Sequence, residues 1–363
     1  MKSSFVGRWV FTSDGLAKGF LRIEEERVAE ICYGDPPSDS QKALILPGFV
    51  NAHTHIGDSV AFPAPRGSVQ EIVGPPDGYK HRVLASAAVK DKVDAMRSAV
   101  KLMNRIGCSL FVDFREEGIK GIEELESSLP PHSPHHLTLG RPVGSEASEE
   151  EIDAILEKSD GLGMSAVRDW PMDFLQRLSR KARGAGKLFA IHASETQRED
   201  IESILSLKPS FLVHMVKATQ SDLEMCADAG VPIVVCPRAN EFFGLGLDIP
   251  RLLRAGVIVG LGTDNGMISQ PDMISELQAA YGMGRGSRRL LPQEVVNLAT
   301  FGGHKVLNAA GKILTEIGIQ YDLVILRVKG DEPLRELVTE TRPEDVMAVV
   351  RGGKVRRPET WTR

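Results

Sequence analysis

The sequence is poor in the features that mark several classes of protein. Among its 363 residues are only four cysteines, and no two of them are closely spaced. Four such cysteines fit buried thiols in a reducing compartment better than a disulfide framework. The apolar runs have the length of a strand and are too short to cross a membrane. No run of the signal-peptide type lies near the first methionine. We therefore expect a cytoplasmic protein with no membrane partner.

Blocks of basic residues are also absent. Lysine and arginine number 44 against 49 acidic residues, which gives a formal net charge of −5. Without a basic patch, the chain lacks the electrostatic footprint of a nucleic-acid-binding protein. The content of 42% hydrophobic and 26% charged residues is that of an ordinary globular domain. We expect a small-molecule substrate and no nucleic-acid partner, and we leave open whether the chain forms a homo-oligomer.

The most informative feature that is present is a pair of histidines, His53 and His55, at the end of an apolar run. Side chains two residues apart on a strand share a face, so both imidazoles would project to the same side. Neutral imidazole is the commonest metal ligand in proteins. The alternative is a chance pair of histidines in a loop, and the pair alone favours metal binding only modestly.

Three later strand-like runs end in the same kinds of side chain, at His192, His214 and Asp264. In a (β/α)8 barrel the carboxyl ends of the strands form the rim on which active sites are built. Four separate strands that each deliver histidine or aspartate to one rim are hard to obtain by chance. The four runs together therefore predict a metal site at a barrel rim.

Strand-like and helix-like runs alternate through the middle of the chain, which predicts a parallel sheet. The expected strands are 44–53, 109–114, 136–140, 163–167, 188–192, 211–214, 233–236 and 257–262. Helical spacing of apolar residues covers 90–106, 174–185 and 221–229. Eight such units predict an α/β fold with a closed (β/α)8 TIM barrel.

The two ends of the chain differ from the middle because they carry short alternating runs typical of antiparallel strands. Neither end has enough strands to bury a core alone, so we expect one small β-sandwich domain formed by both termini. The predicted division is 1–46 for its N-terminal part, 47–311 for the hydrolase barrel and 312–363 for its C-terminal part. Residues 351–354, Arg-Gly-Gly-Lys, predict a hairpin turn.

These motifs together resemble the amidohydrolase superfamily, in its cytosine-deaminase-like or atrazine-triazine hydrolase branch. The matching pieces occur in the family's order and span most of the chain. They are PGFVNAHTH at 47–55, HASE at 192–195, His214, CPRAN at 236–240 and GTD at 262–264. The resemblance implies a metal-dependent hydrolase, with a metal ion held by His53, His55, His192 and Asp264.

The resemblance also implies that His214 lies beside the substrate and that Glu195 handles protons. Glu195 lies three residues beyond His192, so simple alternation cannot place it on the same strand face. That position suits a general acid better than a fourth ligand, although a solvated loop glutamate is the common alternative. Asp264 could accept a proton from the attacking water while it binds the metal. Asn240 would orient a neighbour or hydrogen-bond the substrate.

Three imidazoles and one carboxylate suit a divalent ion, most simply Zn²⁺, and Fe²⁺ or Mn²⁺ would also fit. One ion is favoured over two. Two-metal members of the superfamily bridge their ions with a carboxylated lysine or a glutamate on the fourth strand, and residues 163–168 contain no lysine.

We therefore expect a hydrolytic deaminase that uses metal-bound hydroxide on an aromatic N-heterocycle such as a purine, pyrimidine, pterin or triazine. The alternatives are hydrolysis of a cyclic amide and displacement of another leaving group, such as chloride. A non-catalytic scaffold is disfavoured because all the ligands are retained. The Pro- and Gly-rich stretch 59–80 is expected to cover the site. The sequence assigns no roles to Arg66, His81, Arg141 and Arg168.

Overall fold

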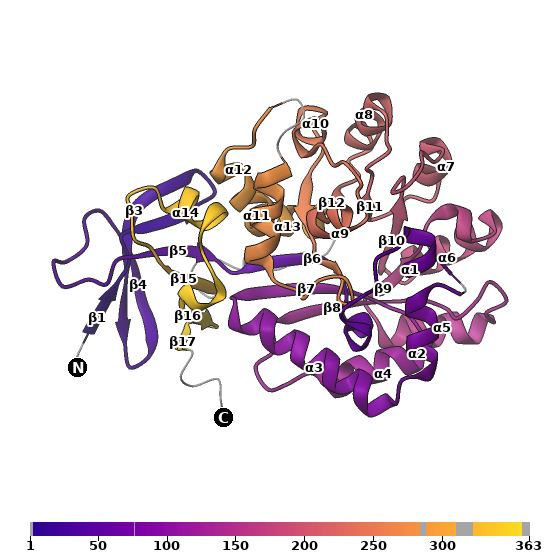
Figure 1. The fold of residues 1–363 in the computed structure, drawn as a ribbon, viewed down its shortest axis with the longest axis horizontal. Coiled ribbons are helices and arrows are strands. Elements are labelled where there is room, and N and C mark those ends of the chain that lie inside the picture. Colours follow the sequence, from indigo (N-terminus) through magenta and orange to yellow (C-terminus); the bar gives the residue numbers. More distant parts are fainter. Residues whose placement is uncertain (1–2, 76, 284–287, 310–321, 358–363) are drawn as a thin grey trace.

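The computed structural model describes residues 3–75, 77–283, 288–309 and 322–357. Within them the chain builds a parallel barrel and a smaller, mostly antiparallel β domain. In Figure 1 both chain ends and the small domain lie on the left, and the barrel with its surrounding helices lies on the right. No helix of these residues is both long and apolar enough to span a bilayer.

The barrel is a sheet of nine parallel strands, in the order β13-β12-β11-β10-β9-β8-β7-β6-β14. Their bounds are Phe49–His55 (β6), Cys108–Arg115 (β7), His135–Gly140 (β8), Gly161–Met164 (β9), Leu188–Ala193 (β10), Phe211–His214 (β11), Ile233–Val235 (β12), Val259–Leu261 (β13) and Asp264–Asn265 (β14). Only two residues separate β13 from β14, and β14 pairs with β6. The two edges of the sheet are therefore joined, which confirms the predicted TIM-like barrel.

Helices pack around this sheet and connect its strands. Their bounds are Val69–Ile72 (α1), Tyr79–Ser86 (α2), Val89–Arg105 (α3), Gly118–Ser128 (α4), Glu149–Lys158 (α5), Met172–Gly184 (α6), Ile201–Ser206 (α7), Gln220–Asp228 (α8), Pro237–Phe242 (α9), Ile249–Arg254 (α10), Met273–Met283 (α11), Pro292–Asn297 (α12) and Gly303–Ala309 (α13). The helices predicted at 90–106, 174–185 and 221–229 correspond to α3, α6 and α8. The apolar faces of α6 and α8 join the main core with the sheet, and the buried face of α3 packs in a separate cluster with residues of β7 and α4.

The small domain combines strands from both ends of the chain, as predicted. Its strands are Ser3–Val6 (β1), Trp9–Thr12 (β2), Gly15–Glu24 (β3), Arg27–Tyr33 (β4), Ala43–Pro47 (β5), Leu323–Arg327 (β15), Val346–Arg351 (β16) and Lys354–Arg356 (β17), with helix Pro333–Thr339 (α14) between β15 and β16. The pairing of β3 with β4 closes the sheet into a ring. Gly352 and Gly353, both with positive φ, make the predicted hairpin turn between β16 and β17.

The strand expected at 44–53 is in fact two strands in two sheets, so that prediction was wrong. The first, β5, pairs antiparallel with β15 in the small domain, and the second, β6, is the first strand of the barrel. The break falls at Gly48, where a Cβ atom would lie 2.6 Å from Cβ of Ser109. Every residue from Ala43 to His55 is buried, so hydrophobicity alone could not reveal the boundary.

Two other expected boundaries also differ or remain open. The fourth barrel strand ends at Met164, and Val167 already belongs to a short 3-10 helix, Val167–Asp169. The predicted boundary between 311 and 312 lies outside the described residues.

Candidate metal centre and pocket

Three imidazole nitrogens converge at the C-terminal rim of the barrel. The Nε2 atom of His192 lies 3.2 Å from Nε2 of His53 and 3.3 Å from Nε2 of His55. With metal–nitrogen bonds of about 2.0–2.1 Å, neighbouring ligands of a tetrahedral ion lie about 3.3–3.4 Å apart. The three nitrogens therefore have the spacing that one small divalent ion requires.

Asp264, on strand β14 next to β6, directs a carboxylate oxygen to the same point. Its Oδ1 atom lies 3.2 Å from Nε2 of His53 and 3.7 Å from Nε2 of His55. Strand β14 brings it there by pairing Asp264 with Thr54, the residue between the two histidines. The structure thus brings together all four side chains that the sequence predicts as ligands, although their role in binding stays a prediction.

The protonation of these groups suits metal binding. Burial lowers the pKa of His53 to about 3, and burial together with the neighbouring imidazoles places the pKa of His192 well below its usual value. Both rings are therefore neutral near pH 7. His192 Nδ1 lies 2.7 Å from the carbonyl oxygen of Met164, which fixes its proton on Nδ1 and leaves the Nε2 lone pair facing the centre. Burial alone would raise the pKa of Asp264, but its hydrogen bond to His53 and the charge of His214 lower it, so the carboxylate is ionised.

Unusual backbone conformations occur at the residues that form the site. Ser194, His214 and Asp264 have φ angles of 47°, 75° and 58°. Non-glycine residues rarely adopt this left-handed region, and such conformations cluster at functional sites because the surrounding fold must stabilise them. Ser194 follows β10, His214 ends β11 and Asp264 begins β14, and of the three His214 and Asp264 line the pocket.

Two polar contacts that sequence reasoning missed hold the histidine pair in place. Asp113 on β7 accepts hydrogen bonds from the Thr54 hydroxyl at 2.9 Å and from the Ile56 amide at 2.8 Å. Asn51 bonds both the backbone amide and the hydroxyl of Thr263. The only available signal was that Asn51 and Asp113 interrupt otherwise apolar strands.

The predicted catalytic side chains lie against this cluster. His214 Nε2 is 3.7 Å from Glu195 Oε1 and 3.9 Å from Asp264 Oδ2. Burial, with the charge of Asp264, raises the pKa of Glu195, and His214 opposes the shift only partly. The Nδ2 atom of Asn240 lies 3.5 Å from Nδ1 of His214. The geometry thus places Glu195, the predicted proton carrier, beside the candidate metal ligands.

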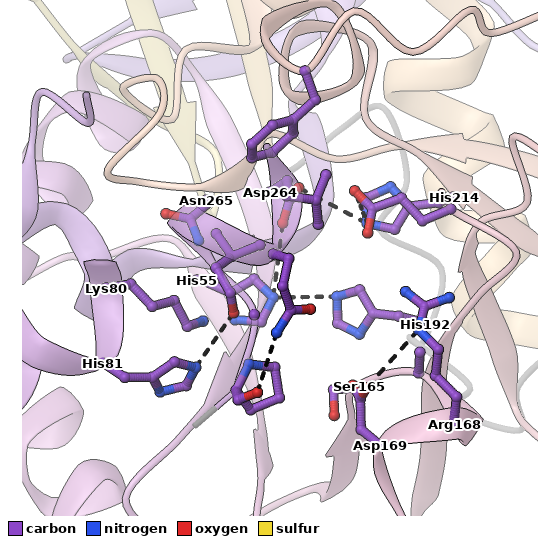
Figure 2. Close-up of a pocket in the computed structure, with 18 of the residues that line it drawn as sticks. His55, Lys80, His81, Ser165, Arg168, Asp169, His192, His214, Asp264 and Asn265 are labelled. Carbon is purple, nitrogen blue, oxygen red and sulfur yellow. Dashed lines mark hydrogen bonds and ion pairs between the residues drawn. The ribbon is translucent and has the colours of Figure 1, made fainter. Parts of the chain in front are cut away.

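Glu195, His214 and Asp264 line one cavity together with His55 and His192, whereas Asn240 is fully buried and is not among the lining residues. Part of its wall comes from residues within 69–75, around α1, and from Lys80 and His81 in α2, in agreement with the prediction that 59–80 covers the site. Figure 2 shows Lys80 and His81 on one side and Arg168 on the other, with His55 and His192 between them.

The four residues without a role in the sequence analysis divide into two groups. His81, Arg141 and Arg168 line the cavity. Arg66 packs instead over the ring of Phe242, 4.9 Å from its centre. Arg141 belongs to a network of buried ion pairs with Lys80, Asp58 and Glu116. The sequence analysis did not predict this network.

Among the described residues, two neighbouring groups have ligand atoms close enough to bind a metal ion. One contains His53, His192, His214 and Asp264, and the other contains His55, Asp58 and Glu116. The first group, joined by Nε2 of His55, is the buried His/Asp cluster described above. In the second group Lys80 already lies between the carboxylates, with Nζ 3.1 Å from Asp58 and 2.8 Å from Glu116. The donor set and spacing therefore fit a divalent ion at the first group.

Comparison with known proteins agrees with this geometry. Residues 44–356 match the Amidohydrolase family. A putative aminohydrolase of Archaeoglobus fulgidus is 35% identical over 82% of this chain and 86% of its own length. A 5-methylthioadenosine/S-adenosylhomocysteine deaminase of Halobacterium salinarum is 27% identical over 86% of this chain and 80% of its own. The crystal structure of atrazine chlorohydrolase TrzN from Arthrobacter aurescens TC1, complexed with zinc, superposes with a TM-score of 0.78. It is 15% identical and covers 97% of this chain and 94% of its own.

Proposed function

Because the chain belongs to the amidohydrolase family, we propose that this metal-dependent hydrolase is a deaminase that removes an amino group from an aromatic N-heterocycle. The observation that carries the proposal is Glu195. It is a buried carboxyl with a raised pKa, 3.7 Å from His214 and beside the His/Asp cluster. A buried carboxyl whose pKa is raised suits delivery of a proton to a departing amine.

His53, His55, His192 and Asp264 would hold one divalent ion, most simply Zn²⁺. Such an ion supplies an activated water by lowering its pKa from 15.7 to about 7. The remaining steps are assigned to side chains of this chain. Asp264 accepts a proton from the water through Oδ2, which faces His214 at 3.9 Å. His214 hydrogen-bonds the attacked region of the substrate, and Asn240, 3.5 Å from its Nδ1, holds its ring.

Glu195 then moves the protons. It donates one to a ring nitrogen, which makes the adjacent carbon more electrophilic, then takes the hydroxyl proton of the adduct and delivers it to the amino group so that ammonia departs. The proton that Asp264 took from the water returns to Glu195 and completes the cycle. The same division of labour between a metal and a glutamate that is not a ligand operates in zinc deaminases of another fold. The deaminase name of the Halobacterium salinarum relative supports amine release in this chain.

Release of chloride or opening of a cyclic amide is the alternative chemistry. The likeness to the chlorohydrolase shows the shared fold and does not favour its reaction. Chloride leaves without a proton, whereas Glu195 is a buried carboxyl whose pKa is raised, which favours its acting as a proton donor. The site therefore supports amine release better.

The test is an assay of purified protein, loaded with zinc, against a panel of aminated purines, pyrimidines, pterins and triazines with detection of ammonia. We expect ammonia release from at least one class, and loss of that activity after removal of the metal with a chelator. Re-addition of zinc should restore it. Activity that is indifferent to the chelator, or hydrolysis only of non-aminated rings, would contradict the proposal.

A further inference from the structure

A buried network of charges lies directly behind one of the candidate metal ligands. Its centre is Glu116, which follows strand β7. Glu116 Oε1 lies 2.8 Å from Lys80 Nζ and 3.3 Å from Arg141 Nη1, and Oε2 lies 3.1 Å from Arg115 Nη2. Nearly all of the Glu116 side chain is buried, at 9% exposure. A carboxylate held by three cations in the interior is fixed in position, because each of its oxygens has a charged partner.

The same carboxylate faces the ligand His55. Oε1 of Glu116 lies 3.2 Å from Nδ1 of His55, the ring nitrogen on the opposite side from the metal-facing Nε2. This Nδ1 atom is buried and has no other hydrogen-bond partner. The pair is within hydrogen-bond distance, although its angle lies outside the regular range. Once Nε2 binds a metal, the proton of the neutral ring must sit on Nδ1, where Glu116 is the available acceptor.

Lys80 explains why this carboxylate serves a histidine and not a second ion. Its ammonium group lies between Asp58 and Glu116, where it balances their charges. The network as a whole pairs the cations Lys80, Arg115 and Arg141 with the carboxylates Asp58, Asp113 and Glu116. Replacing either member of such a buried pair leaves an uncompensated charge, which is costly.

We propose that Glu116, held by Lys80, is a positioning residue that fixes the tautomer and orientation of His55 for metal binding. The inference rests on the proposed function, because it assumes that His55 binds the metal. Carboxylates that accept the second N–H of a metal-bound histidine set the ring orientation and raise its basicity, and their loss weakens metal affinity 10- to 100-fold. Glu116 thereby links the metal centre to Lys80 and Arg141 in the wall of the cavity.

The first test measures zinc affinity by competition with a coloured chelator in the wild type and in Glu116→Gln. Glutamine has nearly the same shape but removes the charge that orients the Nδ1 proton. We expect affinity to fall by roughly 10- to 100-fold. The matched control is Glu124→Gln, which removes another buried glutamate whose partner, Lys92, lies 2.8 Å away on α3, outside the cavity. The control should lower the melting temperature but keep wild-type zinc affinity.

A second measurement does not depend on the folding of Glu116→Gln. In the zinc-loaded wild type, nitrogen-15 NMR of the nine histidines should show one Nδ1 proton that is protected from exchange and shifted downfield by a carboxylate. Lys80→Met should move this signal and weaken zinc binding, since Glu116 loses the group that holds it. Equal zinc affinity in wild type, Glu116→Gln and Lys80→Met, with an unchanged histidine spectrum, overturns the inference while leaving the metal-dependent function intact. Failure of the wild type to bind zinc overturns the proposed function, and this inference with it.

Discussion

At the scale of single residues, the site separates side chains that would bind the metal from one that would move protons. Nε2 of His53 lies 3.2 Å from both Nε2 of His192 and Oδ1 of Asp264, close to the spacing of neighbouring ligands around a tetrahedral ion. Glu195 lies outside that cluster and contacts it through His214. We therefore expect the first group to control metal affinity and Glu195 to control turnover.

Substitution can separate these roles. His192→Ala should lose zinc and activity together, because one of the three imidazoles is gone. Glu195→Gln should keep its zinc and lose turnover by roughly 10²-fold or more, the scale of general acid–base catalysis. Elemental analysis and kcat on the same samples check both results, and we expect about one zinc per wild-type chain. Loss of zinc from Glu195→Gln would make this residue a ligand and contradict the mechanism.

The leaving group provides a second test of Glu195. Two ring substrates that differ only in an amino or a chloro group at the attacked carbon isolate the protonation step, because chloride departs without a proton. Glu195→Gln should slow release of the amine far more than release of chloride. Equal losses of kcat for both substrates would show that Glu195 acts in positioning or in activating water, and would remove the main support for deamination.

At the scale of elements, helix α11 anchors the short helix α9 that carries Asn240. Glu276 on α11 accepts a hydrogen bond from the backbone amide of Arg238, at the start of α9, over 2.9 Å. Glu276 is fully buried, and burial raises its pKa to about 8 from an ordinary value of 4.5. The anchor is thus a protonated carboxyl at neutral pH, and its ionisation is costly because it places a charge in the interior.

This arrangement predicts a pH-dependent stability. Between about pH 4.5 and 8 the folded state holds a proton on Glu276 that the unfolded state has lost, so the free energy of unfolding from this group falls as pH rises. Glu276→Gln mimics the protonated form at every pH. The melting temperature of Glu276→Gln, relative to that of the wild type, should therefore rise as pH increases from 5 to 9. Melting curves that stay parallel across this range would show that Glu276 is ionised in the folded protein.

At the scale of the whole molecule, the small β domain is attached to the barrel at the end opposite the candidate site. Arg351 on β16 donates to the carbonyl oxygen of Cys108, where barrel strand β7 begins, and pairs with Asp322 at 3.5 Å. Both charged side chains are largely buried, with 11% and 5% exposure. This contact joins the two sheets where β7 begins, at the opposite end of the barrel from the candidate site.

Removing this tie should destabilise the protein without altering the chemistry. Arg351→Met leaves Asp322 buried without its cation, which typically costs about 3–5 kcal/mol. The midpoint of urea unfolding should fall accordingly, while zinc affinity and kcat at low temperature stay at wild-type values. Arg27→Met, which removes an exposed arginine of the same domain, is the control and should change stability by less than about 0.5 kcal/mol. A loss of zinc affinity in Arg351→Met at temperatures where it is folded would show that the domain contact shapes the site.

The sequence by itself determined the class of fold and the set of candidate ligands. Alternating strand and helix patterns imply a parallel barrel, and a parallel barrel places the carboxyl ends of its strands on one rim. His53, His192 and Asp264 each end such a strand, so their proximity follows from the pattern. Their metal-binding roles stay predictions.

The tertiary structure alone decided what lies behind those ligands. Periodicity records which face of an element is buried and cannot tell which distant side chains share that interior. Lys80, Glu116 and Arg141 look like surface charges in the sequence, and only the closed barrel brings them together behind His55. The domain division predicted between 46 and 47 lies close to Gly48, but the sequence did not show that a strand ends there. Both strands that Gly48 separates are buried and equally apolar, and only their partners, β15 and β7, place them in different sheets.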